Sequence, residues 1–180
     1  ADYLTRRGVA VLRLDDRDRR SRFLVPTADQ VIAGHCDRLD LPWTMIIGAF
    51  FDGVLRGAVE LTGSPSDGSD RVELAVSVEA AWQGHGAGTE LVRRAVLFCR
   101  NRSIRKIQMV CLLDNRRMQY IARKFEGRLD FDDADVMSDI RVADCTGLSL
   151  WEEMVEDGMA VFLSFYDLWQ PRPPPMARAA

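Results

Sequence analysis

The stretch SVEAAWQGHGAGTELVRRAV runs from Ser77 to Val96 and places three glycines within five residues. It overlaps the end of a segment, Arg71 to Val78, in which apolar and polar residues alternate as in a half-buried strand. Beyond the glycines, apolar residues recur at steps of three and four, as on the buried face of a helix: Leu91, Val92, Ala95, Val96 and Cys99. Bare backbone between a strand and a helix lets main-chain N–H groups approach an anion. The sequence therefore predicts an anion-binding turn.

Two common phosphate-binding loops do not fit this turn. A P-loop requires Lys and then Ser or Thr after its last glycine, whereas Gly88 is followed by Thr89 and Glu90. A dinucleotide loop requires a third glycine where Thr89 stands, and an acidic residue about twenty positions later to hold the ribose. After Glu90 no Asp or Glu occurs before Asp114. A nucleotide-binding oxidoreductase is therefore disfavoured.

The turn instead resembles the acyl-CoA loop of the GNAT superfamily of N-acetyltransferases. That signature is Gln or Arg, two residues, Gly, one residue, and then Gly or Ala; Gln83, Gly86 and Gly88 occupy these positions. The resemblance implies that the loop contacts the diphosphate of coenzyme A through Gln83, Gly84, His85, Gly86, Ala87, Gly88 and Thr89. The alternative is a plain strand-to-helix turn, against which Gln83 and the flanking elements argue. His85 has a second interpretation, as a solvent-facing residue of the loop.

The rest of the chain predicts a mixed α/β domain built around one sheet. Asp52-Gly53 favours a tight hairpin between two apolar runs. Thr27 to Gln30 has the form of a capping box, which starts a helix ending near Leu39. Asp15 to Arg22 is either a short helix or a turn. The other elements predicted are strands at 8–14, 44–51, 54–61, 71–78, 106–113, 128–131 and 136–142, and helices from Leu91 onward and at 115–125.

The resemblance covers the chain from about Gly8 to Val142 and implies a GNAT-type fold. This is a mixed, mostly antiparallel central sheet flanked by helices, with a splayed strand pair at the cofactor site. Strand 71–78 would splay from strand 106–113, and the main chain of Val76 and Val78 would pair with the pantetheine arm. In LLDNRRMQYIARKF, Asn115 matches the motif asparagine and Met118 an apolar position behind it, both near the cofactor. A helix N-cap is a compatible interpretation of Asn115.

The resemblance also implies the reaction, in which acetyl-CoA donates an acetyl group to a primary amine by direct attack in a ternary complex. Glu73, ten residues before Gln83, is the candidate base, with Glu60 in reserve, and the N–H of Val78 would meet the oxyanion. Many relatives carry, seven residues after the motif asparagine, a tyrosine that acts as general acid to the leaving thiolate. This chain has Ala122 at that position. Tyr120 is a weak substitute for it. An acyl-enzyme on Cys111 is an alternative, although a thiol in an apolar strand is usually a packing residue.

The composition limits the classes of partner that the protein is expected to bind. With a net charge of −3 and a pI near 5.5, the 180-residue chain is not expected to bind nucleic acid. The basic residues gather between Leu91 and Leu113, where some could meet the adenosine 3′-phosphate: Arg93, Arg94, Arg100, Arg102, Arg105 and Lys106. Four scattered cysteines predict reduced thiols in a cytoplasmic protein, and two histidines without ligand spacing predict no metal site. No apolar run is long enough to span a membrane.

The predicted domains are a GNAT acetyltransferase domain at residues 1–147, an extension at 148–170, and a Pro-rich, disordered tail at 171–180. The extension is either one helix or a helix and a strand broken at Asp157-Gly158. Its apolar stripe predicts a homodimer interface, or else a cover over the acceptor cleft: Trp151, Val155, Phe162, Tyr166 and Trp169. The expected acceptor is a small-molecule or peptidyl amine; the acidic LDFDDADVMSD would suit a cationic one, or else it is a solvated turn. A non-catalytic acyl-CoA-binding regulator on the same fold is the alternative function.

Overall fold

The computed structural model describes residues 11, 13–37, 44–63 and 70–169, with side chains left out at 36, 37 and 160–169. The chain divides into two compact units, residues 1–145 and 146–180. The predicted boundary at residue 147 is close to this division, but the assignment of domains remains a prediction.

The first unit is built on one six-stranded sheet in the order β1-β2-β3-β4-β6-β5. Every neighbouring pair is antiparallel except β3 and β4, which are parallel. The strands are β1 Thr44–Phe51, β2 Val54–Thr62, β3 Arg71–Val78, β4 Lys106–Leu112, β5 Arg128–Phe131 and β6 Asp135–Arg141. The helices of this unit are α2 Asp16–Phe23, α3 Asp29–Asp37, η3 Ala80–Trp82, α4 Ala87–Asn101 and α5 Arg116–Lys124. This is the mixed, mostly antiparallel sheet flanked by helices that the sequence predicted.

The hydrophobic core lies between the sheet and α4. Alternate residues of the central strands point to this face, among them Val59 and Leu61 of β2 and Leu74 of β3. They pack with the apolar stripe of α4, in which Leu91, Val92, Ala95 and Cys99 are buried. The intervening residues, such as Glu60, point to the opposite face, where α2 and α3 supply partners.

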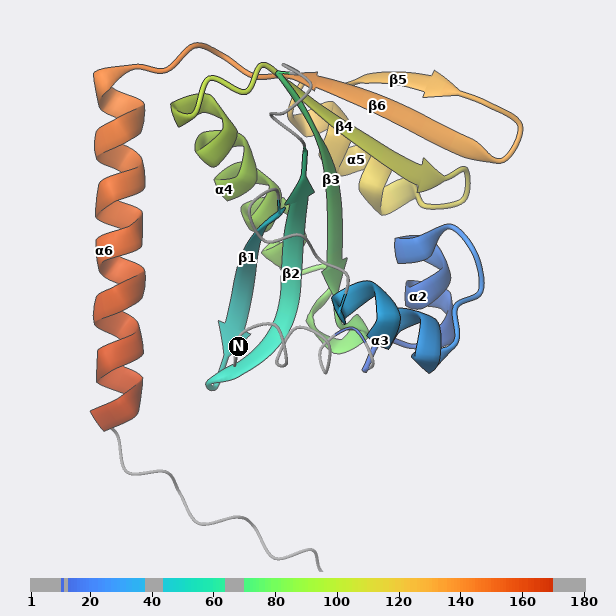
Figure 1. Ribbon diagram of the computed structural model, residues 1–180, viewed down its shortest axis with the longest axis horizontal. Coiled ribbons are helices and arrows are strands. Elements are labelled where there is room, and N and C mark those ends of the chain that lie inside the picture. Colours follow the sequence, from blue (N-terminus) through green and yellow to red (C-terminus); the bar gives the residue numbers. More distant parts are fainter. Residues whose placement is uncertain (1–10, 12, 38–43, 64–69, 170–180) are drawn as a thin grey trace, which may run out of the picture. The chain divides into compact units, whose positions relative to one another are not determined.

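The parallel pair β3 and β4 splays after a short ladder. Only three residue pairs join the two strands, from Arg71↔Lys106 to Glu73↔Gln108. Figure 1 shows the two arrows diverging from there toward their tips. The predicted splay is therefore present, and it leaves a gap between the C-terminal halves of both strands.

The DG hairpin formed as predicted, with positive φ at both turn residues: 51° at Asp52 and 70° at Gly53. The undecided segment after Leu14 became a helix, α2, whose first turn is capped by Asp15 through the N–H of Asp18 at 2.7 Å. The undecided extension is one helix, α6 Gly147–Trp169. The predicted tail at 171–180 lies outside the described residues.

Two local predictions about the N-terminal part were wrong. Most of the predicted strand at 8–14 lies outside the described residues, but Val11 is helical, and Arg13 lies in a turn. The capping box is absent: the Thr27 hydroxyl donates to the carbonyl of Val25 instead of accepting from a helix N–H, and α3 begins with the Ala28 carbonyl accepting from Val31. The end predicted near Leu39 lies outside the described residues.

Candidate active site

The glycine loop leaves the N terminus of α4 open. Gly84 and Gly86 have φ angles of 79° and 89°, a region that side chains with a Cβ rarely adopt. The first helical bond runs from the N–H of Glu90 to the carbonyl of Gly86, and no side chain caps the helix. The N–H groups of Ala87, Gly88 and Thr89 therefore lack intrahelical acceptors and add to the positive end of the helix dipole. This arrangement suits an anion.

Gln83 ties this loop to two helices. Its main-chain N–H donates to the Ala80 carbonyl at 3.2 Å, so that amide is already engaged. Its side-chain Nε2 donates to the carbonyl of Val78 at 2.8 Å and to Asp18 of α2 at 2.7 Å. Its Oε1 accepts from Arg117 of α5. Gln83 thus acts on the loop through its side chain, and Arg117 is a cation at the loop that sequence reasoning missed.

The edge of β3 in the gap presents main-chain groups. The N–H of Glu79 donates to the carbonyl of Arg56 at 2.8 Å, so Glu79 faces β2 with its backbone. Backbone direction alternates along an antiparallel pair, so Val78 and Val76 turn their main-chain groups away from β2 and into the gap. The side chains of both valines pack against the core beneath α4. The two predicted main-chain contact residues therefore border the gap.

The two candidate glutamates lie on the α2 side of the sheet in different environments. Glu73 is exposed, and its strand neighbours are Thr62 and Gln108. Glu60 is only 4% exposed, and its Oε2 accepts from Arg22 of α2 at 2.5 Å. The Nε2 of His35 on α3 is 3.6 Å from the other oxygen of Glu60. Glu60 therefore anchors the two N-terminal helices to β2, whereas Glu73 is open to solvent.

Helix α5 carries the other predicted site residues. Asn115 caps it, accepting from the N–H of Met118 at 3.2 Å, and Met118 is half-buried against the core. Tyr120 is 64% exposed, whereas Ala122 is 2% exposed. Gln119 is fully buried and donates to the Leu113 carbonyl at 2.9 Å, which fixes α5 to the end of β4. Nothing in the sequence pattern marked Gln119.

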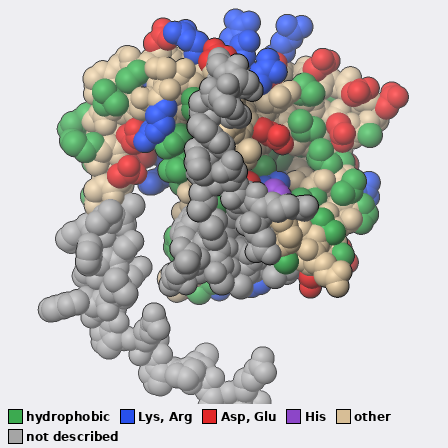
Figure 2. Space-filling view, in the orientation of Figure 1, with side chains coloured by type: hydrophobic (Ala, Val, Ile, Leu, Met, Phe, Trp, Pro, Cys, Tyr) green, Lys and Arg blue, Asp and Glu red, His purple; other side chains and the backbone are tan. Residues whose placement is uncertain are grey.

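Most of the predicted basic residues lie away from the loop or are already engaged. Arg93 and Arg94 bind Glu90 within α4, and their hydrogen bonds lower the pKa of that carboxyl. Lys106 stands beside Arg71 and Arg141 at the start of β3. Figure 2 shows Lys and Arg side chains gathered at that end of the molecule. The length of β3, about 25 Å, separates this end from the glycine loop.

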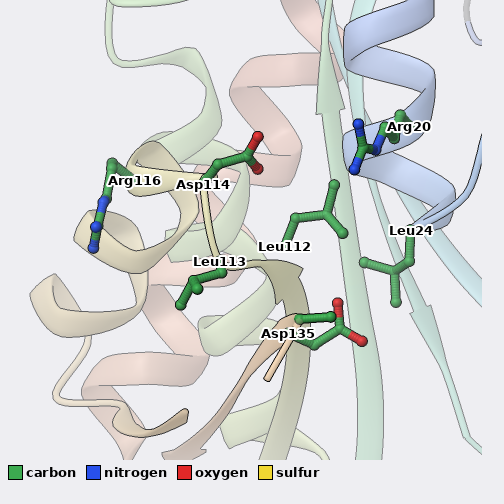
Figure 3. Close-up of a pocket in the computed structure, with 8 residues that line it drawn as sticks. Arg20, Leu24, Leu112, Leu113, Asp114, Arg116 and Asp135 are labelled. Carbon is green, nitrogen blue, oxygen red and sulfur yellow. The ribbon is translucent and has the colours of Figure 1, made fainter. Parts of the chain in front are cut away.

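A cavity of about 520 Å³ opens on the α2 side of β4. Arg20 of α2 and Leu24, which caps the C terminus of that helix, face Leu112 at the end of β4, with Asp114 and Asp135 beside it (Figure 3). His85 of the loop is exposed.

Among the described residues, no group of His, Cys, Asp and Glu is arranged to hold a metal ion. In the same part of the chain, none of the helices has the length and apolar character needed to cross a membrane.

The sequence matches one known protein family over more than half of its length. Residues 9–126 match the acetyltransferase (GNAT) family, which is more than half of the sequence. The chain belongs to the GNAT family. No curated protein matches the sequence. The GNAT resemblance that the glycine loop suggested is therefore confirmed.

Solved GNAT structures share the fold. The GNAT domain of S. lividans PAT superposes with a TM-score of 0.66 at 20% identity, covering 78% of this chain and 86% of that one. RimL, a ribosomal L7/L12 alpha-N-protein acetyltransferase in complex with coenzyme A, has a TM-score of 0.62 at 16% identity, with coverage of 81% and 91%. PaiA N-acetyltransferase from Thermoplasma acidophilum, also with coenzyme A, has 0.53 at 16%, with coverage of 63% and 71%. At such identities the likeness concerns the fold.

Proposed function

We propose that this GNAT protein transfers an acetyl group from acetyl-CoA to a primary amine by direct attack in a ternary complex. The observation that carries the proposal is the open N terminus of α4, which follows through the glycine loop a strand, β3, whose pairing with β4 ends at Glu73. The diphosphate of coenzyme A would bind the amides of Gly84 to Thr89, and Arg117 would add a positive charge there. The pantetheine arm would pair as an added strand with the main chain of Val76 and with the N–H of Val78, since Gln83 already holds the Val78 carbonyl. The RimL and PaiA complexes with coenzyme A support this.

The base would be Glu73. A primary amine has a pKa of about 10.4 and must lose a proton before its nitrogen can attack the thioester carbon. Glu73 is exposed on the sheet face opposite α4, where an amine can approach a thioester held in the gap. As the C–N bond forms and the C–S bond breaks, the proton passes to Glu73, directly or through water. Glu60 is a poor base because Arg22 already occupies its carboxylate.

The oxyanion donor would be Val76 rather than the expected Val78. Five residues of extended strand, about 16 Å, separate Val78 from Glu73, whereas Val76 is about 10 Å away. An amine that delivers its proton to Glu73 through one water reaches a carbonyl at Val76 more readily. Both N–H groups border the gap, so the distance of each from Glu73 decides between them.

The leaving thiolate would take its proton from water, because Ala122 has no hydroxyl and Tyr120 is largely in solvent. Cys111 is not a suitable nucleophile. Burial, and then the charge of Asp135, raise the pKa of its thiol, which disfavours the thiolate. A non-catalytic acyl-CoA-binding regulator remains the second candidate function, favoured by the absence of a tyrosine at Ala122.

The test follows free-thiol release from acetyl-CoA with a panel of amines. Glu73→Gln should lower kcat by about 10²- to 10⁴-fold, as expected for loss of a general base, with the Kd for coenzyme A unchanged. Glu126→Gln removes the same charge from an exposed position after α5 and should behave as wild type. Near-normal turnover by Glu73→Gln would remove Glu73 from the mechanism. Tight binding of coenzyme A without thiol release for any amine would favour the regulator.

The proposal extends to assembly and location. The described part of α6 exposes Trp151 and Val155, and we propose that this stripe forms a homodimer interface. Cys99 and Cys111 are buried thiols outside any disulfide bond, which supports the proposal of a reducing, cytoplasmic compartment.

A further inference from the structure

The cavity beside β4 lies where an acceptor must enter, if the proposed function holds. The diphosphate site belongs to α4, on one side of the sheet, so an attacking amine has to come from the other side. The cavity is on that side, lined by Arg20 of α2 and by Leu24 at the C-terminal cap of that helix. In the register set by Glu73↔Gln108, Leu112 stands level with Ser77, next to Val76. The cavity therefore opens beside the stretch of gap that we assign to the thioester.

The cavity is lined by charged side chains of both signs, which are available to bind a ligand. Within the described residues, no side-chain hydrogen bond or ion pair engages Arg20, Asp114 or Asp135. Figure 3 shows these three side chains directed to the space between α2 and the end of β4, whereas Arg116 extends away from it. The guanidinium of Arg116 donates instead to Gln119 at 3.1 Å. One cation and two carboxylates therefore face the same space, with leucines between them.

We propose that this cavity binds the zwitterionic head of a free α-amino acid whose side chain ends in the primary amine to be acetylated. Arg20 would hold the α-carboxylate, and Asp114 and Asp135 would hold the α-ammonium. Leu24 and Leu112 would pack against the methylenes that carry the amine toward the gap. The volume of about 520 Å³ lies within the range of small-molecule sites, about 300–1,000 Å³, and is ample for a free amino acid.

The experiment compares acceptors that keep the reacting amine and lose one head group. L-Lysine and L-ornithine carry both groups, pentane-1,5-diamine lacks the carboxylate, and Nα-acetyl-lysine lacks the α-ammonium. A lysine tripeptide blocked at both ends lacks both groups. The free amino acid should have a kcat/KM at least about tenfold above each analogue, because a site built to pair a polar group rejects a molecule without it. Equal turnover of the blocked tripeptide would overturn the proposal in favour of a protein acceptor.

Variants assign each head group. Arg20→Gln should lower kcat/KM for the free amino acid to about the value for the diamine, while leaving the diamine unchanged. Asp135→Asn should remove the preference over Nα-acetyl-lysine in the same way. The matched controls, Arg17→Gln on the same helix and Asp133→Asn in the β5–β6 turn, remove the same charges outside the cavity and should retain both preferences. An equal loss for every acceptor would overturn the proposal.

Calorimetry separates this inference from the proposed function. Coenzyme A should bind the full chain, and L-lysine or L-ornithine should then bind the loaded protein. Failure of both amino acids to bind the loaded protein overturns the inference and leaves the acyl-CoA site intact. Failure of coenzyme A itself to bind overturns the proposed function.

Discussion

Two glutamates on one face of the sheet show how environment assigns roles to chemically identical residues. Glu60 and Glu73 occupy neighbouring strands, and both point away from α4. The side chain of Glu60 is 5% exposed and paired with that of Arg22, itself 12% exposed, whereas Glu73 is in solvent. A buried carboxylate held by a guanidinium supports the fold, while an exposed one is available for proton transfer.

Glu60→Gln should therefore act on stability. Removing the carboxylate charge takes a buried charge partner from the guanidinium of Arg22, at a cost of about 2–4 kcal/mol in the free energy of unfolding. Urea denaturation measures this loss, and kcat of the folded protein should change far less than in Glu73→Gln. Unchanged stability together with a large fall in kcat would make Glu60 the base instead.

The buried and the exposed thiols should differ in their reactivity toward an alkylating reagent. Burial raises the pKa of Cys99 to about 12 and also raises the pKa of Cys111, so neither forms a reactive thiolate near neutral pH. With iodoacetamide and peptide mapping, Cys145 should be modified in the folded protein, and Cys99 and Cys111 only after unfolding.

The raised pKa of Cys99 predicts how the stability of the fold changes with pH. Since the folded pKa of Cys99 exceeds its usual value of 9.0, its contribution to stability is present below pH 9 and is lost as pH rises toward about 12. Rapid alkylation of Cys111 in the folded protein at pH 7 would contradict the packing role and revive an acyl-enzyme.

At the scale of elements, the loop and α4 act as one unit. Gly86 is both the N-cap of α4 and a residue at positive φ, so the direction of the free amides depends on that conformation. No atom lies within 4 Å of a Cβ built on Gly86, so a side chain there meets strain in the backbone rather than a collision.

Gly86→Ala should weaken coenzyme A binding by more than it destabilises the fold. The left-handed conformation costs a residue with a Cβ about 1–2 kcal/mol, which the loop can relieve by turning its amides away from the ligand. The control is Gly53→Ala in the β1–β2 turn, where φ is 70° and the space around a Cβ is equally open. It should lose similar stability in urea and keep its Kd for coenzyme A. Equal Kd values for the two variants would contradict a diphosphate site at this loop.

Periodic elements were predictable, and the N-terminal ones were not. Alternation and helical spacing were enough for β3 and the apolar stripe of α4, since each repeats over several turns or pleats. The capping box at Thr27 did not form: the hydroxyl donates to the carbonyl of Val25 instead of accepting from a helix N–H, a local hydrogen bond that sequence spacing cannot reveal. In the candidate site, Gln83 was singled out by the resemblance to the family's loop signature and the glycines by their spacing, whereas nothing in the sequence pointed to Arg117 or Gln119.

At the scale of the whole molecule, the chain consists of an α/β unit and a helical one. Helix α6 exposes large apolar side chains on its described part, with Trp151 at 59% and Met154 at 64%. Its charged residues are all acidic: Glu152, Glu153, Glu156, Asp157 and Asp167. An apolar surface of this kind on a helix favours association.

Trp151→Glu should convert the proposed homodimer into a monomer while the Kd for coenzyme A is kept, because the substitution places a charge in the apolar stripe. Sedimentation velocity over a concentration series measures the assembly. Phe131→Glu, the same kind of change at a side chain 51% exposed at the end of β5, is the control and should remain a dimer. A wild-type chain that is monomeric at all concentrations would contradict the interface.

The sequence alone determined the features that depend on local repetition and backbone freedom. These are the alternating strands, the apolar helix faces, the DG hairpin and the glycine turn before α4, because each is encoded in neighbouring residues. Tertiary structure alone decided which distant charges meet. Arg22 reached Glu60 across 38 positions, and Asp18 and Arg117 both reached Gln83. The pairings of Arg22 and Asp18, and the cavity beside α2, arise from the docking of α2 against two diverging strands, an arrangement that no local pattern specifies.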